Sequence, residues 1–245
     1  MTSVLQTTLL YALFPVVATS LGGLLAGYLP GAARFRGLIL YFAAGVVFSV
    51  VAVELLPGVL RRAVLPAVII GFGLGVAVML GLRSLTARLG GAPKPEVAAN
   101  AVPVSLLVAV GIDFLLDGLL LGIGFAAGAN IGVLLALAET AEQLAVGLAL
   151  AGELTAAGTT RMRAFLTTAL LSLLVFVTAV VGATVLSHLS GPVMEGVLSF
   201  GLAALLFLVT EELLKEAHEE PGTLVGTAMF FVGFLIFLVV GIAFN

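Results

Sequence analysis

The sequence predicts an all-α integral membrane protein with eight transmembrane helices. Of its 245 residues, 62% are hydrophobic and 9% are charged, and its mean hydropathy is +1.30. These values lie outside the range of soluble globular proteins. The apolar residues fall into runs of about 20, the length that a membrane-spanning helix needs, and no run requires a strand. The absence of cysteine excludes disulfides, thiolate metal ligands and cysteine nucleophiles.

Short segments that contain glycine, proline or charged residues separate the apolar runs. Only the connection 84–101 is long enough to be a flexible loop, so residues 1–245 are expected to form a single transmembrane domain. No basic residue precedes the first run, which is therefore expected to be a retained helix and not a cleaved signal peptide. The expected spans are about 4–28, 36–57, 65–83, 102–127, 130–152, 164–187, 193–213 and 222–244.

Basic residues are distributed unevenly between the two sets of loops. Loops that follow the odd-numbered spans hold eight of them, whereas the opposite loops hold only Arg61 and Arg62. Cytoplasmic loops carry the excess of Lys and Arg, so the pattern predicts a multi-pass protein of the plasma (inner) membrane. Both termini are expected outside and the loop 84–101 in the cytoplasm. The eight residues are Arg34, Arg36, Arg83, Arg88, Lys94, Arg161, Arg163 and Lys215.

Two acidic pairs lie near the middle of the fourth and fifth spans. Asp113 and Asp117 are four residues apart, and Glu139 and Glu142 are three apart, so each pair occupies one face of its helix. The turn 128–130 is expected to join the two helices as an antiparallel hairpin. With a rise of about 1.5 Å per residue, the four carboxyls then fall within roughly 9 Å of one another in depth. Neither helix contains a Lys, Arg or His.

The cost of burying acids predicts a cationic partner for these pairs. An acidic side chain at the bilayer centre costs about 2.5 to 3.5 kcal/mol on insertion scales, so metal ions or protons are expected between the helices. The alternative is a set of neutral carboxyls that bond to hydroxyls or backbone carbonyls. Carboxylate ligands without imidazole or thiolate favour Mn²⁺, Fe²⁺, Mg²⁺ or Ca²⁺ over Cu⁺, and Zn²⁺ also accepts them.

Other polar residues are candidates for the same pathway. Gln143 offers either a neutral oxygen ligand or a polar contact to a neighbouring helix. Glu54 at the outer end, and Glu211 with Glu212 at the inner end, are either entry and exit ligands or solvated helix ends. His218 is either a ligand of a transient inner metal site or part of a charged helix end that reaches the interface.

A short internal similarity predicts an inverted repeat. The second span ends in Glu54-Leu55-Leu56 and the seventh in Glu212-Leu213-Leu214, and these two helices are expected to run in opposite directions. Such an arrangement is typical of inverted repeats that flank a midplane site. We therefore expect helices 1–3 and 6–8 to be repeated around a central hairpin of helices 4 and 5.

The motifs in this order resemble those of the ZIP family of divalent-metal transporters over nearly the full chain. The family's His-Asn-x-x-Asp/Glu-Gly motif matches residues 113–118, and its His/Gln-Asp/Glu-x-Pro-Glu-Gly motif matches residues 138–143. The His-Leu-Leu-Pro motif of its second span matches residues 54–57, and Glu-Leu-Ile-Pro-Glu-Ala-His of its seventh span matches residues 212–218. The eight spans and the cytoplasmic loop 84–101 also fit this family.

The resemblance implies a transporter that moves divalent metal ions (Zn²⁺, Fe²⁺, Mn²⁺ or Cd²⁺) toward the cytoplasm by alternating access. The hairpin and its companion spans would move against a scaffold of spans two, three, seven and eight, in a homodimer. Asp113 stands where the family has a metal-binding His, Phe114 replaces the adjacent Asn, and Ala138 replaces a His or Gln. The resemblance therefore implies one metal site, built from Asp113, Asp117, Glu139 and Glu142.

Three other functions compete with this hypothesis. The carboxylates could form a proton relay for a proton-coupled transporter of another solute, or the chain could be a non-transporting relative with a structural role. An intramembrane hydrolase is disfavoured, because the chain lacks an intramembrane His, a Cys and a Gly-x-Ser-x-Gly elbow. We expect no enzymatic activity and no resident cofactor. The expected partners are divalent metal ions, the lipid bilayer and a second copy of the chain, with no nucleic acid.

Overall fold

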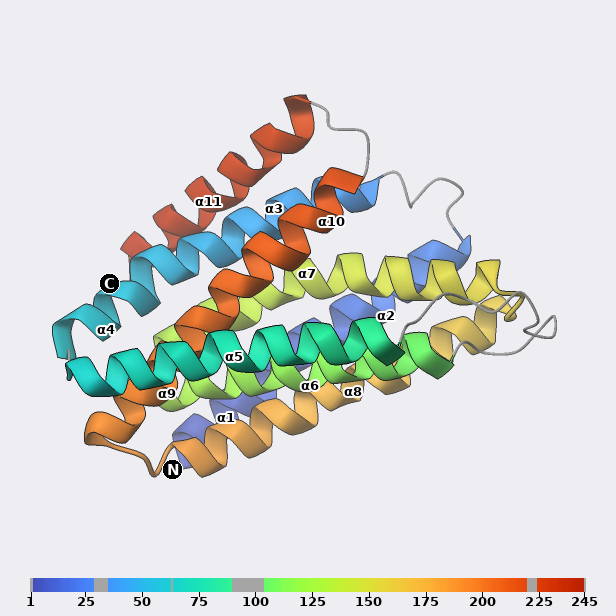
Figure 1. Cartoon of the computed structure of the whole chain (residues 1–245). Coiled ribbons are helices and arrows are strands. Elements are labelled where there is room, and N and C mark those ends of the chain that lie inside the picture. Colours follow the sequence, from blue (N-terminus) through green and yellow to red (C-terminus); the bar gives the residue numbers. More distant parts are fainter. Residues whose placement is uncertain (1, 29–34, 63, 90–103, 220–223, 245) are drawn as a thin grey trace.

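The computed structural model describes residues 2–28, 35–62, 64–89, 104–219 and 224–244, and within them it is a helical bundle without strands (Figure 1). Eight helical spans in these residues have the length and apolar composition to cross a membrane. The prediction of an all-α, multi-pass membrane protein is therefore confirmed. The spans are Leu5–Tyr28, Arg36–Arg61, Leu65–Thr86, Val104–Ala127, Ala129–Ala156, Arg161–Leu186, Gly191–Leu213 and Leu224–Ala243.

Several spans are built from more than one helical element. In the first span the helix is interrupted at Ala12, three residues before Pro15, whose ring nitrogen cannot donate a helical hydrogen bond. The elements are α1 (Thr2–Tyr11), α2 (Leu13–Tyr28), α3 (Arg36–Val50), η2 (Val51–Leu55), α4 (Leu56–Arg62), α5 (Leu65–Leu89), α6 (Val104–Ala127), α7 (Ala129–Ala156), α8 (Arg161–Leu186), α9 (Gly191–Phe207), η3 (Leu208–Leu213), α10 (Leu214–Glu219) and α11 (Leu224–Phe244).

The second and seventh spans each contain a π-helical segment. The N–H of Leu56 donates to the carbonyl of Val51 at the end of η2, and the N–H of Leu214 donates to the carbonyl of Val209 at the end of η3. Both bonds reach back five residues in place of four, which widens the helix locally. The two segments contain the acidic residues predicted at the span ends, Glu54 in η2 and Glu211 with Glu212 in η3.

The helices pack in a regular pattern of pairs (Figure 1). In one group α2 packs against α7 and α8, and α6 packs against α7 and α8. Outside this group α3 pairs with α11, and α5 pairs with α9. The contact between α3 and α7 joins the two sets. We call the end of the bundle with Arg83 and Lys215 the basic end, and the end with the turn at Gly128 the hairpin end.

Glycines allow the paired helices to approach closely. A Cβ atom at Gly147 of α7 would lie 2.2 Å from the carbonyl oxygen of Thr19 on α2. A Cβ atom at Gly71 of α5 would lie 2.1 Å from the carbonyl oxygen of Gly196 on α9. Small residues at such contacts are the usual means of tight helix packing in lipid. Gly71 therefore serves internal packing, whereas a Cβ atom at Gly81 would meet no neighbouring atom within 4 Å among the residues that the structure describes.

The turn between α6 and α7 consists of one residue. Gly128 follows Ala127 directly and precedes Ala129, and its backbone is extended. Its N–H donates to the carbonyl of Gly124 at 3.1 Å, and its own carbonyl accepts from the N–H of Gly132 at 3.0 Å. The two helices form a hairpin as predicted, but Ala129 and Asn130, expected in the turn, already belong to α7.

One difference from the predicted boundaries lies at the end of the third span. Residues 84–89, expected in the loop, continue α5 to Leu89. The helix outlasts the apolar run because no glycine or proline interrupts it before Gly90. The rest of the predicted loop, residues 90–101, lies outside the described residues.

Candidate functional site

The predicted acidic pairs of α6 and α7 point into the bundle. Asp117, Glu139 and Glu142 are each only 2% exposed, and Asp113 is half-buried. Burial follows from the spacing of each pair, because residues three or four apart share one helix face. The face that carries them is the one that α6 and α7 turn toward the other helices.

These carboxylates share one electrostatic environment with a fifth acid from another span. Asp113 interacts electrostatically with Asp117, Glu139 and Glu142, and also with Glu212 of η3. Asp117 likewise interacts with each of the other four. The two aspartates of α6 therefore connect the glutamates of α7 with the glutamate of η3. We call these five residues the acidic cluster.

Gln143 bridges two helices inside the bundle. Its Nε2 atom donates to Oδ2 of Asp117 on α6 at 2.7 Å, and its Oε1 atom accepts from Oγ1 of Thr19 on α2 at 2.8 Å. Gln143 and Thr19 are both fully buried. Of the two predicted roles for Gln143, the structure shows the polar contact to neighbouring helices. Sequence reasoning missed Thr19, a hydroxyl within an apolar span close to Gly22 and Gly23.

Part of the cluster is buried without hydrogen bonds. Both carboxyl oxygens of Glu139 and the Oε2 atom of Glu142 have no hydrogen-bond partner in the described part of the chain. Buried polar atoms of native proteins are nearly always satisfied, so each exception requires an explanation. Within the same described residues, no group of three or more His, Asp or Glu side chains is arranged closely enough to hold a metal ion.

A cavity of about 380 Å³ leads from the basic end to the cluster. It lies between α5, α6 and the η3–α10 segment, and Asp113 and Glu212 both line it. Thr86 and Ala109 form part of its wall. The cavity therefore connects the half-buried end of the acidic cluster with the surface at the basic end. The other lining residues are Met79, Leu82, Arg83, Val110, Ile112, Leu116, Glu211 and Lys215.

Basic side chains face the acids at the mouth of this cavity. Arg83 of α5 forms an ion pair with Glu211 and also interacts electrostatically with Glu212. The side chains of Arg83 and Glu211 are 45% and 43% exposed, so the pair lies at the surface. Lys215 of α10 lines the same cavity. The α6–α7 hairpin has no basic residue of its own, but the fold brings two from other spans.

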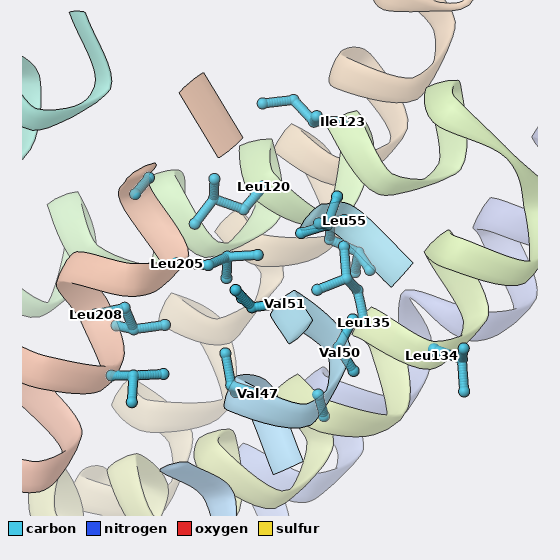
Figure 2. Close-up of a cluster of buried hydrophobic side chains, with 14 of the residues drawn as sticks. Val47, Val50, Val51, Leu55, Leu120, Ile123, Leu134, Leu135, Leu205 and Leu208 are labelled. Carbon is cyan, nitrogen blue, oxygen red and sulfur yellow. The ribbon is translucent and has the colours of Figure 1, made fainter. Parts of the chain in front are cut away.

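Buried aliphatic side chains from several spans fill the bundle next to the acidic helices (Figure 2). Leu120 follows Asp117 along α6 toward the hairpin end, and Leu135 precedes Glu139 on α7. Figure 2 shows Leu120, Val51 and Leu205 gathered from three different spans. We call the following buried residues the apolar plug: Val51, Leu55, Leu120, Leu135 and Leu205.

Two predicted ligands lie away from the acidic cluster. The Oε1 atom of Glu54 lies beside Gly241 of α11. His218 is exposed, and its ring centroid lies 5.4 Å from that of Tyr41 on α3. Neither side chain belongs to the lining of the cavity, whereas Glu211 and Glu212 do. Of the residues predicted at the span ends, the fold therefore joins only the pair in η3 to the central carboxylates.

The fold and the site together define a multi-pass α-helical membrane protein with a largely buried acidic cluster. No protein-family model matches the sequence. No curated protein matches it either. The resemblance to the ZIP family therefore stays a prediction from the sequence motifs.

Proposed function

We propose that the protein is a ZIP-like transporter that moves divalent metal cations through the acidic cluster toward the cytoplasm by alternating access. One observation carries the proposal. Buried carboxylates of α6 and α7, with half-buried Glu212 of η3, lie between a cavity at the basic end and the apolar plug at the hairpin end. This is the arrangement that a midplane binding site needs, with one open and one closed access.

Electrostatics supports a cation as the substrate. Five carboxylates in one environment repel one another, and burial strengthens that repulsion because the interior screens charge poorly. Glu139 and Glu142 have buried oxygens without hydrogen-bond partners in the described residues. A divalent cation would supply the missing partner and draw the side chains together. Without a cation, mutual repulsion would hold the carboxylates apart, which accounts for the absence, in the described residues, of three acidic side chains close enough to bind a metal ion.

The packing pattern supports an inverted repeat of spans 1–3 and 6–8. Spans one and six have matching partners, since α2 packs against α7 and α8 packs against α6. Spans two and seven match in the same way, since α3 packs against α11 and α9 packs against α5. The π-helical segments η2 and η3 occur in this second pair. A two-fold relation with the α6–α7 hairpin at its centre would produce each of these matches.

The same pattern separates two bodies that could move against each other. Helices α2, α6, α7 and α8 form one, and α3, α5, α9 and α11 form the other. The acidic cluster, the cavity and the apolar plug all take residues from both bodies. A shift between the bodies would therefore open the plug and close the cavity. If the basic end is cytoplasmic, as the distribution of Lys and Arg indicates, the present conformation is open to the inside.

A flux assay tests this function. The purified chain is reconstituted in liposomes, and uptake of Mn²⁺, Fe²⁺, Zn²⁺ and Cd²⁺ is measured against empty liposomes. We expect saturable uptake of at least one of these ions, because the carboxylate ligands suit divalent metals. Absence of uptake for all four ions would contradict the proposal. Uptake of an organic solute that persists in chelator would favour the proton-relay alternative.

A further inference from the structure

Three side chains from three spans form a buried hydrogen-bonded series. Thr19 donates to the amide oxygen of Gln143 at 2.8 Å, and the amide nitrogen of Gln143 donates to Oδ2 of Asp117 at 2.7 Å. All three are at most 2% exposed. Because an ionised carboxylate only accepts hydrogen bonds, the nitrogen of Gln143 has to face Asp117. The oxygen of the amide then has to face Thr19.

Contacts with residues other than Gln143 and Asp117 fix the position of Thr19. Its backbone packs against Gly147, where a Cβ atom would lie 2.2 Å from the Thr19 carbonyl oxygen. Its hydroxyl also lies 2.8 Å from the carbonyl oxygen of Pro15, so one hydroxyl proton is shared between two acceptors. This packing keeps the donor of α2 next to the amide. The orientation of Gln143 is therefore set from both ends, by Thr19 and by Asp117.

We propose that Thr19 and Gln143 are positioning residues that make Asp117 a one-oxygen ligand and so favour small divalent cations over Ca²⁺. The inference rests on the proposed function and names the substrate preference of the same site. With Oδ2 accepting from the amide, one side of that oxygen is occupied, which hinders a cation from binding both oxygens of Asp117 at once. The amide oxygen of Gln143 is likewise engaged, by Thr19. The series thus makes two oxygens less available to a cation.

The loss of oxygen ligands affects ions differently because they require different numbers of ligands. Ca²⁺ takes about six to eight oxygen ligands and often binds a carboxylate through both oxygens. Zn²⁺ is satisfied by about four ligands, with carboxylate oxygens at about 2.0–2.2 Å. A site with fewer available oxygens therefore penalises Ca²⁺ more. Loss of the Thr19 hydroxyl would release Oε1 of Gln143 to the cation, and loss of the Gln143 amide would release Oδ2 of Asp117, so either change reduces that penalty.

The test measures Ca²⁺ competition against uptake of the transported ion in proteoliposomes. Variants Thr19→Val and Gln143→Leu remove the hydroxyl and the amide, and Val keeps the branched shape of Thr19 while the backbone contact with Gly147 is unaffected. We expect the ratio of the Ca²⁺ inhibition constant to the KM of the transported ion to fall about tenfold in both, the usual scale for residues that orient metal ligands. Thr19→Ser, which keeps the hydroxyl, should retain the wild-type ratio.

A matched control separates positioning from packing. Ser20 is the neighbour of Thr19 on α2, and its hydroxyl donates to the carbonyl of Val16 in its own helix at 2.8 Å. Ser20→Ala should leave the ratio unchanged. If Thr19→Val does not reach the membrane, Gln143→Met still breaks the series by removing the amide, and its ratio is compared with that of the wild type. An unchanged ratio in the Thr19 and Gln143 variants, with wild-type flux intact, overturns the inference alone, whereas absence of wild-type flux overturns the proposed function as well.

Discussion

A chain that carries both Asp117→Asn and Glu142→Gln should lose divalent cation flux, by about 100-fold or more. Both side chains are buried, and each replacement keeps the shape while removing the charge. Residues that merely orient metal ligands already cost about 10- to 100-fold when changed, so two direct ligands should cost at least the upper value. The measurement is initial uptake into proteoliposomes at saturating ion, with equal amounts of inserted protein.

The control for this variant comes from the same helix. Glu153 is an exposed acid of α7, and Glu153→Gln should retain wild-type flux. Thermal stability of the double variant should equal or exceed that of the wild type, because mutual repulsion within the cluster is reduced. The asparagine that replaces Asp117 would still offer an oxygen to the amide of Gln143. Flux near the wild-type rate in the stable double variant would rule out the acidic cluster as the pathway.

The second large effect is expected in the accessibility of introduced thiols. The chain contains no cysteine, so single replacements can be labelled without background. Ala109 lines the cavity, and we expect the Ala109→Cys variant to react with a membrane-impermeant maleimide added from the cytoplasmic side. Leu120 is 3% exposed in the apolar plug. The Leu120→Cys variant should react at least about tenfold more slowly from either side, because thiol reactions require access.

The sidedness of this reaction also tests the orientation of the protein. Labelling Ala109→Cys from the outer side alone would contradict the assignment of the basic end to the cytoplasm. Equal labelling of Leu120→Cys from the outside would contradict a closed plug. Thr86→Cys, on the wall of the same cavity, provides an independent second position. Its rate should follow that of Ala109→Cys.

Hydropathy and helix spacing predict much of this fold, because in a membrane each span is defined by its own sequence. The eight spans and the hairpin at Gly128 follow from apolar run lengths and one glycine-centred turn. The burial of Asp117, Glu139 and Glu142 follows from their spacing on one helix face. These features depend on residues close together in the chain.

Contacts between distant spans were not predictable in the same way. Thr19 lies 124 residues from Gln143, and hydropathy carries no information on which spans are neighbours. The approach of Arg83 to Glu211, 128 residues away, depends on the pairing of α5 with the seventh span. The π-helical segments η2 and η3 also escaped prediction, because the sequence pattern of a π-helix differs little from that of an α-helix.

Anomalous scattering from crystals soaked in Mn²⁺ or Cd²⁺ tests the central claim most directly. If the acidic cluster binds divalent cations, an anomalous peak should lie between α6 and α7, within about 2.0–2.6 Å of carboxyl oxygens of Asp117 and Glu142. The peak should disappear in the Asp117→Asn, Glu142→Gln variant. Well-ordered crystals with no peak at these side chains, at ion concentrations that saturate uptake, would contradict the claim.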